Sequence, residues 1–285
     1  MTLLEADVKR RNIPRELHPA QSSHEPKPAA ETRPDLDLRS GLPLVIDTQA
    51  LVATGLLPNE KQADSVAHEY RSIKYWLRLQ QPRSTGGAES KSRLLGVTSA
   101  LPGDGKTTVS LNLGLSYTDD DEGVILVDAD LAKRGLSQAL GAIDRPGLAN
   151  LIATESLRLN ELLLRTSIPG LFLLPAGNVS RRGIELIGTT RGSKVVSQVA
   201  QLAGERTVIF DTSPLLLTSE SSLLAAWMDQ IVLVVRAGQT SQDAAVAARA
   251  RLQRSVPTSV ILNDWKPLGL AEREYHDSYN EYHKR

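Results

Sequence analysis

The chain has 285 residues, of which 41% are hydrophobic and 23% are charged, a balance that suits a globular α/β protein with a large core. Its 33 lysines and arginines equal its 33 aspartates and glutamates, which excludes a global field that attracts nucleic acid or acidic lipid. The chain has no cysteine, which excludes disulfides and thiolate metal sites, and no apolar run reaches the ~18–20 residues that span a bilayer. These properties fit a cytoplasmic protein, and any work at a membrane would require a partner that brings it there.

Two segments are expected ahead of the core domain. Residues 1–43 are polar and rich in proline and charge, so they bury too little apolar surface to pack and are expected to form a flexible arm. Residues 44–92 begin with an apolar stretch that indicates a short docking segment, and they end in a linker rich in proline, glycine and serine. Between these, the spacing predicts a charged helix over 63–79 whose apolar face consists of Val66, Tyr70, Ile73 and Leu77.

Residues 93–264 are expected to form an α/β domain. Apolar strands are predicted near 94–98, 123–128, 171–175, 206–211, 230–236 and 259–263. Helices are predicted near 106–118, 147–164, 192–203, 219–227 and 241–254. Most of the strands are continuous apolar runs, which is typical of parallel strands that are covered on both sides. The sequence therefore predicts a mostly parallel central sheet with helices on both faces.

A glycine-bearing loop joins the first strand of this domain to its first helix. The residues from Ser99 to Thr107 match the phosphate-binding loop of the P-loop NTPase-like fold, in preference to a simple Gly-Pro turn. Glycine lets backbone amides approach phosphate oxygens, and the start of the following helix attracts the same anion. Lys106 is suited to the β- and γ-phosphates, and the Thr107 hydroxyl is suited to magnesium. The expected nucleotide-binding residues of the loop are Gly103, Asp104, Gly105, Lys106, Thr107 and Thr108.

Acidic residues end the second and fourth predicted strands. Asp128 and Asp130 follow the second strand, at an edge of the sheet that lies beside the phosphate loop in this fold. Two neighbouring carboxylates are costly unless a cation joins them, which indicates magnesium. Asp211 follows four apolar residues and is expected to hold a magnesium-bound water. The alternative interpretations are a strand-end turn with a helix cap for the first pair, and a solvated strand-end carboxylate for Asp211.

Three of the six tyrosines, Tyr275, Tyr279 and Tyr282, lie within the last eleven residues of the chain. Few apolar neighbours accompany them, so packing does not explain their density. Their spacing of four and three residues places them on one face of a helix, and an amphipathic terminal helix is therefore one interpretation. The other interpretation is a flexible tail, residues 265–285, that offers phenol hydroxyls to a kinase.

Taken together, these motifs resemble the bacterial tyrosine kinase (BY-kinase) family, the cytoplasmic autokinases of exopolysaccharide and capsule export. The resemblance rests on the loop at 99–107, the acidic motif at 126–131, the strand end at 210–216 and the tyrosine-bearing tail. The segments 69–74 and 164–177 are also similar to the subgroup associated with exosortase loci. The resemblance extends from about residue 44 to the end of the chain.

The resemblance implies an ATP-dependent protein-tyrosine autokinase with ATP and Mg²⁺ as cofactors. The implied catalytic residues are Lys106, Asp128 and Asp130. Asp128 would accept or orient the proton of the incoming tyrosine hydroxyl. The implied metal ligands are Thr107, Asp130 and Asp211. Asn263, which follows the last strand, would contact adenine.

The resemblance also implies a homo-oligomeric ring in which the tail of one subunit enters the site of its neighbour. The implied subunit-contact residues are Glu69, Arg71 and Lys74. The implied autophosphorylation sites are Tyr275, Tyr279 and Tyr282. A membrane polysaccharide co-polymerase would activate the kinase at the inner face of the cell membrane, a cognate tyrosine phosphatase would be a further partner, and no nucleic acid would be involved.

Two other interpretations remain open. Ala132 stands where the family usually has arginine, and Lys133 and Arg134 follow it, which supports a non-catalytic nucleotide-binding regulator of the co-polymerase. The partitioning and cell-division-site ATPases share this fold, but they usually carry a signature lysine at the position of Leu101, where leucine cannot reach a partner's nucleotide.

Overall fold

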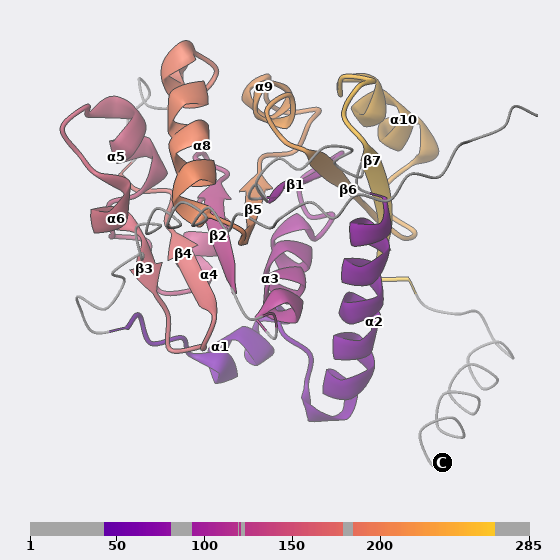
Figure 1. Ribbon diagram of the computed structural model, residues 1–285. Helices are drawn as coiled ribbons and strands as arrows, with labels where there is room; N and C mark the ends of the chain where they lie inside the picture. The colour runs from indigo at the N-terminus through magenta and orange to yellow at the C-terminus, as the bar shows by residue number, and fades with distance from the viewer. Residues whose placement is uncertain (1–42, 81–92, 119, 121–122, 179–184, 266–285) are drawn as a thin grey trace, which may run out of the picture. The chain divides into compact units, whose positions relative to one another are not determined.

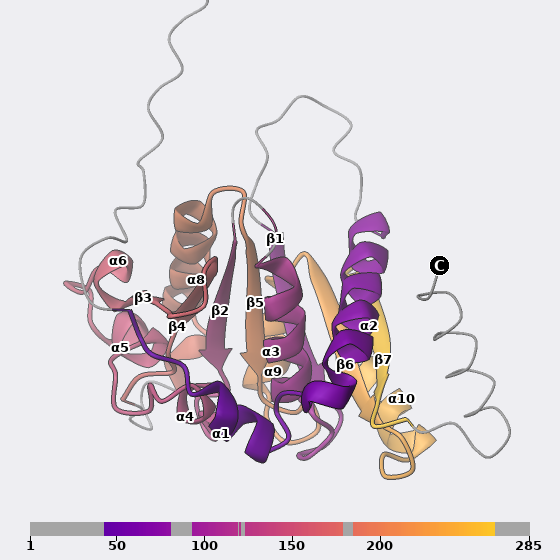
Figure 2. The ribbon, with the colours of Figure 1, turned by 90° about the horizontal axis from the view of Figure 1, so that it is seen from below.

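The computed structural model describes residues 43–80, 93–118, 120, 123–178 and 185–265 (Figures 1 and 2). The expected arm apart from Pro43, the linker at 81–92 and the expected tail apart from Trp265 lie outside these ranges. The three tail tyrosines are among the residues outside, and the expected domain boundaries stay predictions. All the described residues belong to one compact unit, Leu36–Arg285.

A seven-stranded sheet organises the described chain, in the order β3-β4-β2-β5-β1-β6-β7. The strands are β1 (Arg93–Ser99), β2 (Val124–Ala129), β3 (Leu164–Arg165), β4 (Leu171–Leu174), β5 (Thr207–Thr212), β6 (Gln230–Arg236) and β7 (Thr258–Asn263). Every neighbouring pair is parallel except β3 and β4, which are antiparallel. The six strands expected from the sequence are confirmed, and β3 is an additional edge strand. The predicted fold class, a mostly parallel α/β sheet, is confirmed.

Helices cover both faces of the sheet, as expected (Figure 1). One face carries α5 (Leu148–Ala153), α6 (Leu159–Leu162), α8 (Thr190–Ala203), α9 (Glu220–Ala225) and α10 (Gln242–Ala250). The other face carries α1 (Thr48–Ala53), α2 (Glu60–Leu79), α3 (Lys106–Tyr117) and α4 (Gly135–Ala139). Each set of helices packs on the sheet through its own apolar core.

The strands supply both cores because successive side chains point to opposite faces of a sheet. In β2, Ile125 and Val127 pack into the core beneath α5 and α8. Val124 and Leu126 pack into the opposite core with α3. All six residues of β2 are buried, which explains why this strand is continuously apolar up to its acidic end.

The single helix expected over 147–164 is wrong, because the chain there forms α5, α6 and β3. Thr154 ends α5 with an extended backbone, and β3 pairs with β4 through Leu164 and Arg165. The open edge of β4 supplies the backbone partners that draw this segment out of a helix. An apolar pattern alone does not separate a short buried strand from a helix. The short helix α4 was not expected either.

The predicted charged helix is confirmed as α2, which lies along α3 (Figure 2). The Asn59 side chain caps its start by accepting a hydrogen bond from the amide of Gln62 at 3.2 Å. From its expected apolar face, Leu77 is buried, and Tyr70 and Ile73 pack partly buried against the same core as α3. Among the described residues, no helix is both long enough and apolar enough to cross a membrane.

Candidate functional site

The predicted phosphate loop connects the end of β1 to the first residue of α3. Gly103 and Gly105 both have left-handed backbones, with φ values of 89° and 96°. Gly105 caps α3, and a Cβ placed on it would lie 1.9 Å from Asn263 Nδ2. Glycine is therefore required at residue 105 both for its backbone conformation and for the close approach of a neighbouring side chain. The loop presents the amino end of a twelve-residue helix, an arrangement that favours anions.

The side chain of Asp104 braces this loop from within. Its Oδ2 accepts a hydrogen bond from the amide of Leu101 at 2.9 Å, and its Oδ1 accepts one from Thr240 Oγ1 at 2.7 Å. The residue is buried, and its carboxylate would repel phosphate. Any contact of Asp104 with a nucleotide would therefore involve its backbone amide. Its carboxylate stabilises the conformation of the loop.

Two residues at the ends of β6 and β7 hold the outside of the loop. Asn263 Nδ2 donates to the carbonyl of Asp104 at 2.9 Å, so its amide group faces the loop. Arg236 donates to the carbonyl of Gly103 at 3.1 Å and pairs with Asp264 at 3.0 Å. The adenine contact expected for Asn263 stays a prediction. Neither Thr240 nor Arg236 was expected from the sequence, because no local pattern marks them.

The structure brings the expected charged residues of the site together. Lys106 Nζ lies 2.8 Å from Asp130 Oδ2 and 3.9 Å from Asp211 Oδ1. Thr107 Oγ1 donates to Asp211 Oδ2 at 2.8 Å. Thr108 is half-buried in the first turn of α3, and its carbonyl accepts a hydrogen bond from Asn112. The lysine, the threonine and both acids thus meet directly behind the loop.

Burial and the neighbouring charges set the protonation of this cluster. Burial alone would lower the pKa of Lys106, but the charges of Asp211 and Asp130 raise it above its ordinary value. Burial also acts to raise the pKa of Asp130, but Lys106 and hydrogen bonds that include one from Ser213 together hold it below its usual range. Lys106 and Asp130 therefore form a charged pair at neutral pH.

Asp128 is fully enclosed, as Asp211 is, whereas Asp130 is slightly exposed. Asp128 lies beside Asp211 in the register of β2 and β5, and both side chains are fully buried. Burial, followed by the charge of Asp211, raises the pKa of Asp128 to about 7. Its Oδ2 accepts hydrogen bonds from both the amide and the hydroxyl of Ser137, each at 2.7 Å. Its Oδ1 is buried and has no hydrogen-bond partner among the described residues. Sequence reasoning missed Ser137.

The donor atoms of the site fit magnesium held jointly with phosphate oxygens. Within the described ranges, no cluster of three or more histidine, cysteine, aspartate or glutamate side chains is arranged to hold a metal ion. Magnesium characteristically takes one or two carboxylates together with substrate phosphates and water. Thr107, Asp130 and Asp211 offer hard oxygen atoms of this kind. The metal-ligand assignment stays a prediction.

The three expected subunit-contact residues have different environments on α2. Glu69 and Arg71 are exposed, whereas Lys74 is buried against α3. Lys74 Nζ donates to the carbonyl of Ser116 at 2.6 Å and pairs with Asp120 at 3.2 Å. The contacts of Lys74 are therefore internal to the described chain, and a subunit contact through these residues stays a prediction.

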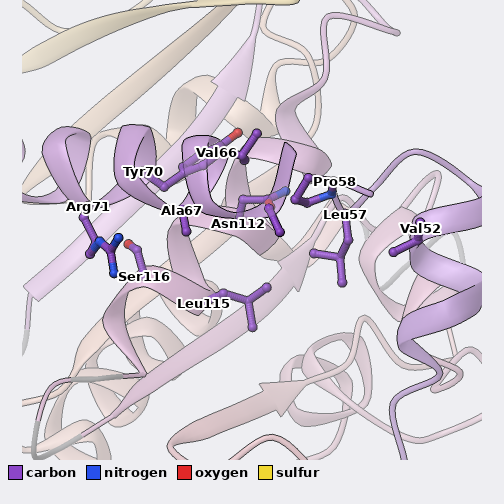
Figure 3. A pocket seen from close by; sticks show the side chains of 11 residues that line it. Val52, Leu57, Pro58, Val66, Ala67, Tyr70, Arg71, Asn112, Leu115 and Ser116 are labelled. Atoms are coloured by element: carbon purple, nitrogen blue, oxygen red, sulfur yellow. The ribbon is translucent and has the colours of Figure 1, made fainter. Parts of the chain in front are cut away.

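A mostly apolar cavity of about 280 Å³ lies where α2, α3 and the segment joining α1 to α2 meet (Figure 3). Arg71 and Tyr70 line it from α2, and Asn112 and Leu115 line it from α3. None of the phosphate-loop residues and none of the three site aspartates lines this cavity. It is therefore separate from the charged cluster.

Residues 132–134 follow the acidic motif and include the position where arginine is usual. Ala132 is exposed, and it offers no charge at the place where arginine is usual. Arg134 has a left-handed backbone, with φ 52°, and it caps the start of α4. Lys133 contributes its amide, which donates to Asp130 Oδ1 at 3.2 Å.

No protein-family model matches the chain. The tyrosine-protein kinase CpsD of Streptococcus agalactiae is 27% identical over 200 residues, which cover 68% of this chain and 83% of that protein. The tyrosine-protein kinase YwqD of Bacillus subtilis is 28% identical over 190 residues, which cover 65% of this chain and 78% of that protein.

Solved structures agree with these relatives. The kinase domain of VpsO has a TM-score of 0.60 and 28% identity, and the match covers 71% of this chain and 95% of that domain. A ParA family ATPase from Chlorobium tepidum has a TM-score of 0.50 and 20% identity over 60% of this chain and 74% of that one, a likeness of fold alone.

The sheet, the loop and the acids behind it define a P-loop nucleotide-binding protein of the open α/β type. Within that class, the chain is similar in sequence and in fold to bacterial tyrosine-protein kinases.

Proposed function

We propose that the protein is an ATP- and magnesium-dependent protein-tyrosine autokinase that regulates exopolysaccharide synthesis or export. The observation that carries this proposal is the convergence of Lys106, Asp130 and Asp211 behind a phosphate loop, beside the buried Asp128. A plain nucleotide-binding site needs the loop and its lysine. A buried carboxylate with one unpartnered oxygen is what the additional task of orienting a hydroxyl group requires.

Nucleotide binding rests on the loop and on Lys106. The amides at the start of α3 would face the phosphates of a bound nucleotide, and the positive end of the helix favours their charge. The Lys106 ammonium, which pairs with Asp130 in this structure, would bind the β- and γ-phosphates of a bound nucleotide. Magnesium, held by Thr107 with Asp130 and Asp211, would neutralise charge that develops on the γ-phosphate.

The chain's own contribution to phosphoryl transfer is positioning and charge. Asp128 Oδ1 faces no partner within the described residues and is the atom that accepts a hydrogen bond from the incoming phenol. A phenol has an ordinary pKa of about 10, so the proton leaves late or passes to a nearby acceptor. With its pKa raised to about 7, Asp128 is a stronger proton acceptor than an exposed aspartate.

The acceptors are the tail tyrosines Tyr275, Tyr279 and Tyr282 of a neighbouring subunit in a ring. Each phosphorylation adds ~1.5–2 negative charges at neutral pH. Modified tails are repelled by the three site aspartates, leave the site and weaken the ring. A membrane polysaccharide co-polymerase activates the kinase at the inner face of the membrane, and a phosphatase resets the cycle.

A non-catalytic nucleotide-binding regulator is the second candidate. It is favoured by the exposed Ala132, which offers no positive charge next to the acidic motif. A partitioning-type ATPase switch is disfavoured by Leu101, whose side chain cannot take the part of a signature lysine.

One incubation separates these functions. The purified protein is incubated with Mg-ATP, with and without the cytoplasmic end of a candidate co-polymerase, and analysed by mass spectrometry. A kinase shows phosphate on the three tail tyrosines, which is lost in the triple Tyr→Phe variant and in Lys106→Met. Steady ATP turnover with an unmodified tail supports the ATPase switch. Bound nucleotide without either reaction supports the regulator, and the absence of nucleotide binding overturns the proposal.

A further inference from the structure

Ser137 directs both its amide and its hydroxyl to one carboxylate. It lies in α4 with 1% of its surface exposed. Its amide and its hydroxyl each donate to Asp128 Oδ2 at 2.7 Å. The amide of Ala176, which follows β4, donates to the same hydroxyl at 2.9 Å. Ser137 thus connects α4, the end of β2 and the loop after β4.

These contacts fix the direction of the Ser137 hydroxyl proton. A serine hydroxyl carries one proton, and a backbone amide can only donate to it. Because Ala176 N–H points at Ser137 Oγ, the hydroxyl proton is free to point at Asp128, whose ionised carboxylate can only accept. The resulting bond is charge-assisted and holds the carboxylate in one orientation.

The same arrangement leaves the other oxygen of Asp128 without a hydrogen-bond partner among the described residues. Both hydrogen bonds from Ser137 end on Oδ2, while Oδ1 is buried without a partner among the described residues. Buried polar atoms in native proteins are usually hydrogen-bonded, so an unpartnered carboxylate oxygen in a reaction site calls for a donor from outside the chain. A hydroxyl group of the phosphoryl acceptor is such a donor.

We propose that Ser137 is a positioning residue that holds Asp128 Oδ2, so that Oδ1 alone faces and orients the acceptor hydroxyl. This inference rests on the proposed function, because it concerns the acceptor side of the same site. Ser137 touches neither nucleotide nor acceptor and acts only through Asp128.

The substitution Ser137→Ala removes one of the two donors to Oδ2 and leaves Ala176 N–H without its partner. The carboxylate then gains rotational freedom, and small misplacements of a reacting group cost up to about 100-fold in rate. We expect kcat to fall about 10- to 100-fold, while KM for Mg-ATP stays within about twofold, because the loop that binds phosphate is unchanged.

The test compares wild type, Ser137→Ala, Ser137→Thr, Asp128→Asn and the double variant Asp128→Asn/Ser137→Ala, in phosphorylation of the tail at saturating Mg-ATP. Ser221→Ala is the matched control, because Ser221 is also buried and its hydroxyl shares a hydrogen bond with that of Thr218, just ahead of α9. We expect Ser137→Thr to recover most of the rate and Ser221→Ala to keep it. In the Asp128→Asn background, Ser137→Ala should have almost no further effect, because the residues act as a unit.

Three results distinguish a failure of this inference from a failure of the proposed function. Full kcat in Ser137→Ala overturns the inference and leaves the proposed function intact. An equal loss from Ser137→Ala in the wild-type and Asp128→Asn backgrounds also overturns it, because Ser137 would then act elsewhere. A wild-type protein that binds Mg-ATP but phosphorylates no tyrosine overturns the proposed function itself. Thermal unfolding of each variant shows whether a rate loss comes from a folded protein.

Discussion

Asn263 at the end of β7 lies directly against Gly105 at the tip of the phosphate loop. Its Nδ2 donates to the carbonyl of Asp104 at 2.9 Å, in the space that a Cβ on Gly105 would need. The predicted phosphate loop and the last strand of the sheet therefore form one packed unit, although the two bonded residues are 159 positions apart in the chain. Changes at either residue are expected to reach nucleotide binding.

We expect Gly105→Ala to abolish measurable Mg-ATP binding. The new Cβ would lie 1.9 Å from Asn263 Nδ2, and the left-handed backbone adds about 1–3 kcal/mol of strain. Gly103→Ala is the matched control, because Gly103 has a similar φ but no atom within 4 Å of the added Cβ. Calorimetry should show the smaller loss for Gly103→Ala, and Gly105→Ala/Asn263→Ala should regain part of the affinity. Equal losses in the two single variants would show that the contact with Asn263 is irrelevant.

The substitution Thr240→Val is expected to loosen the loop with little change in side-chain shape. It removes the donor to the buried Asp104 carboxylate, a loss of about 1–3 kcal/mol. If the loop conformation that binds nucleotide is destabilised by this free energy, Mg-ATP affinity falls roughly 5- to 100-fold. Thr258→Val serves as the control, since the Thr258 hydroxyl bonds the carbonyl of Val256 at the other end of β7. Unchanged affinity in Thr240→Val would refute the bracing role.

Substitutions at two residues of α2 are expected to have different effects, one on the stability of the subunit and the other on the assembly of subunits. Lys74→Met removes an ammonium that bonds Ser116 and Asp120, and we expect the free energy of unfolding to drop by about 1–3 kcal/mol. Arg71→Ala changes an exposed side chain and should leave that free energy within about 0.5 kcal/mol. Urea unfolding measures the first effect, and sedimentation measures assembly. A ring that survives Arg71→Ala and Glu69→Ala unchanged would contradict the predicted subunit contact.

The raised pKa of Asp128 makes the metal-free protein pH-sensitive. Its folded-state pKa of about 7 exceeds the ordinary value of 3.8, so the folded state binds the extra proton between these values. The contribution of Asp128 to stability is complete below about pH 4 and is lost as the pH rises through about 7. In EDTA, Asp128→Asn should therefore become more stable relative to wild type between pH 4 and pH 8. A stability difference independent of pH over this range would refute the shift.

Local sequence patterns were sufficient to predict the parts of the site that are contiguous or periodic. The phosphate loop, the acids at residues 128, 130 and 211, and six strands follow from local patterns, because strand burial and anion binding at a helix start each impose a short-range spacing. The same patterns indicated the fold class and the family. They failed at residues 147–164, where the apolar spacing also suits a helix. There the end of the segment pairs with the edge of β4 and forms a strand instead.

The distant residues that support that site are identified by the folded chain and not by any local pattern. Thr240 reaches Asp104 across 136 positions, and Ala176 reaches Ser137 across 39, because the order of the sheet sets β1 between β5 and β6 and β2 between β4 and β5. The fold likewise places the Lys74 ammonium against the carbonyl of Ser116, near the end of α3. Such contacts leave no periodic mark in the sequence, since a single polar side chain becomes a brace only when folding supplies the buried carboxylate or carbonyl that it meets.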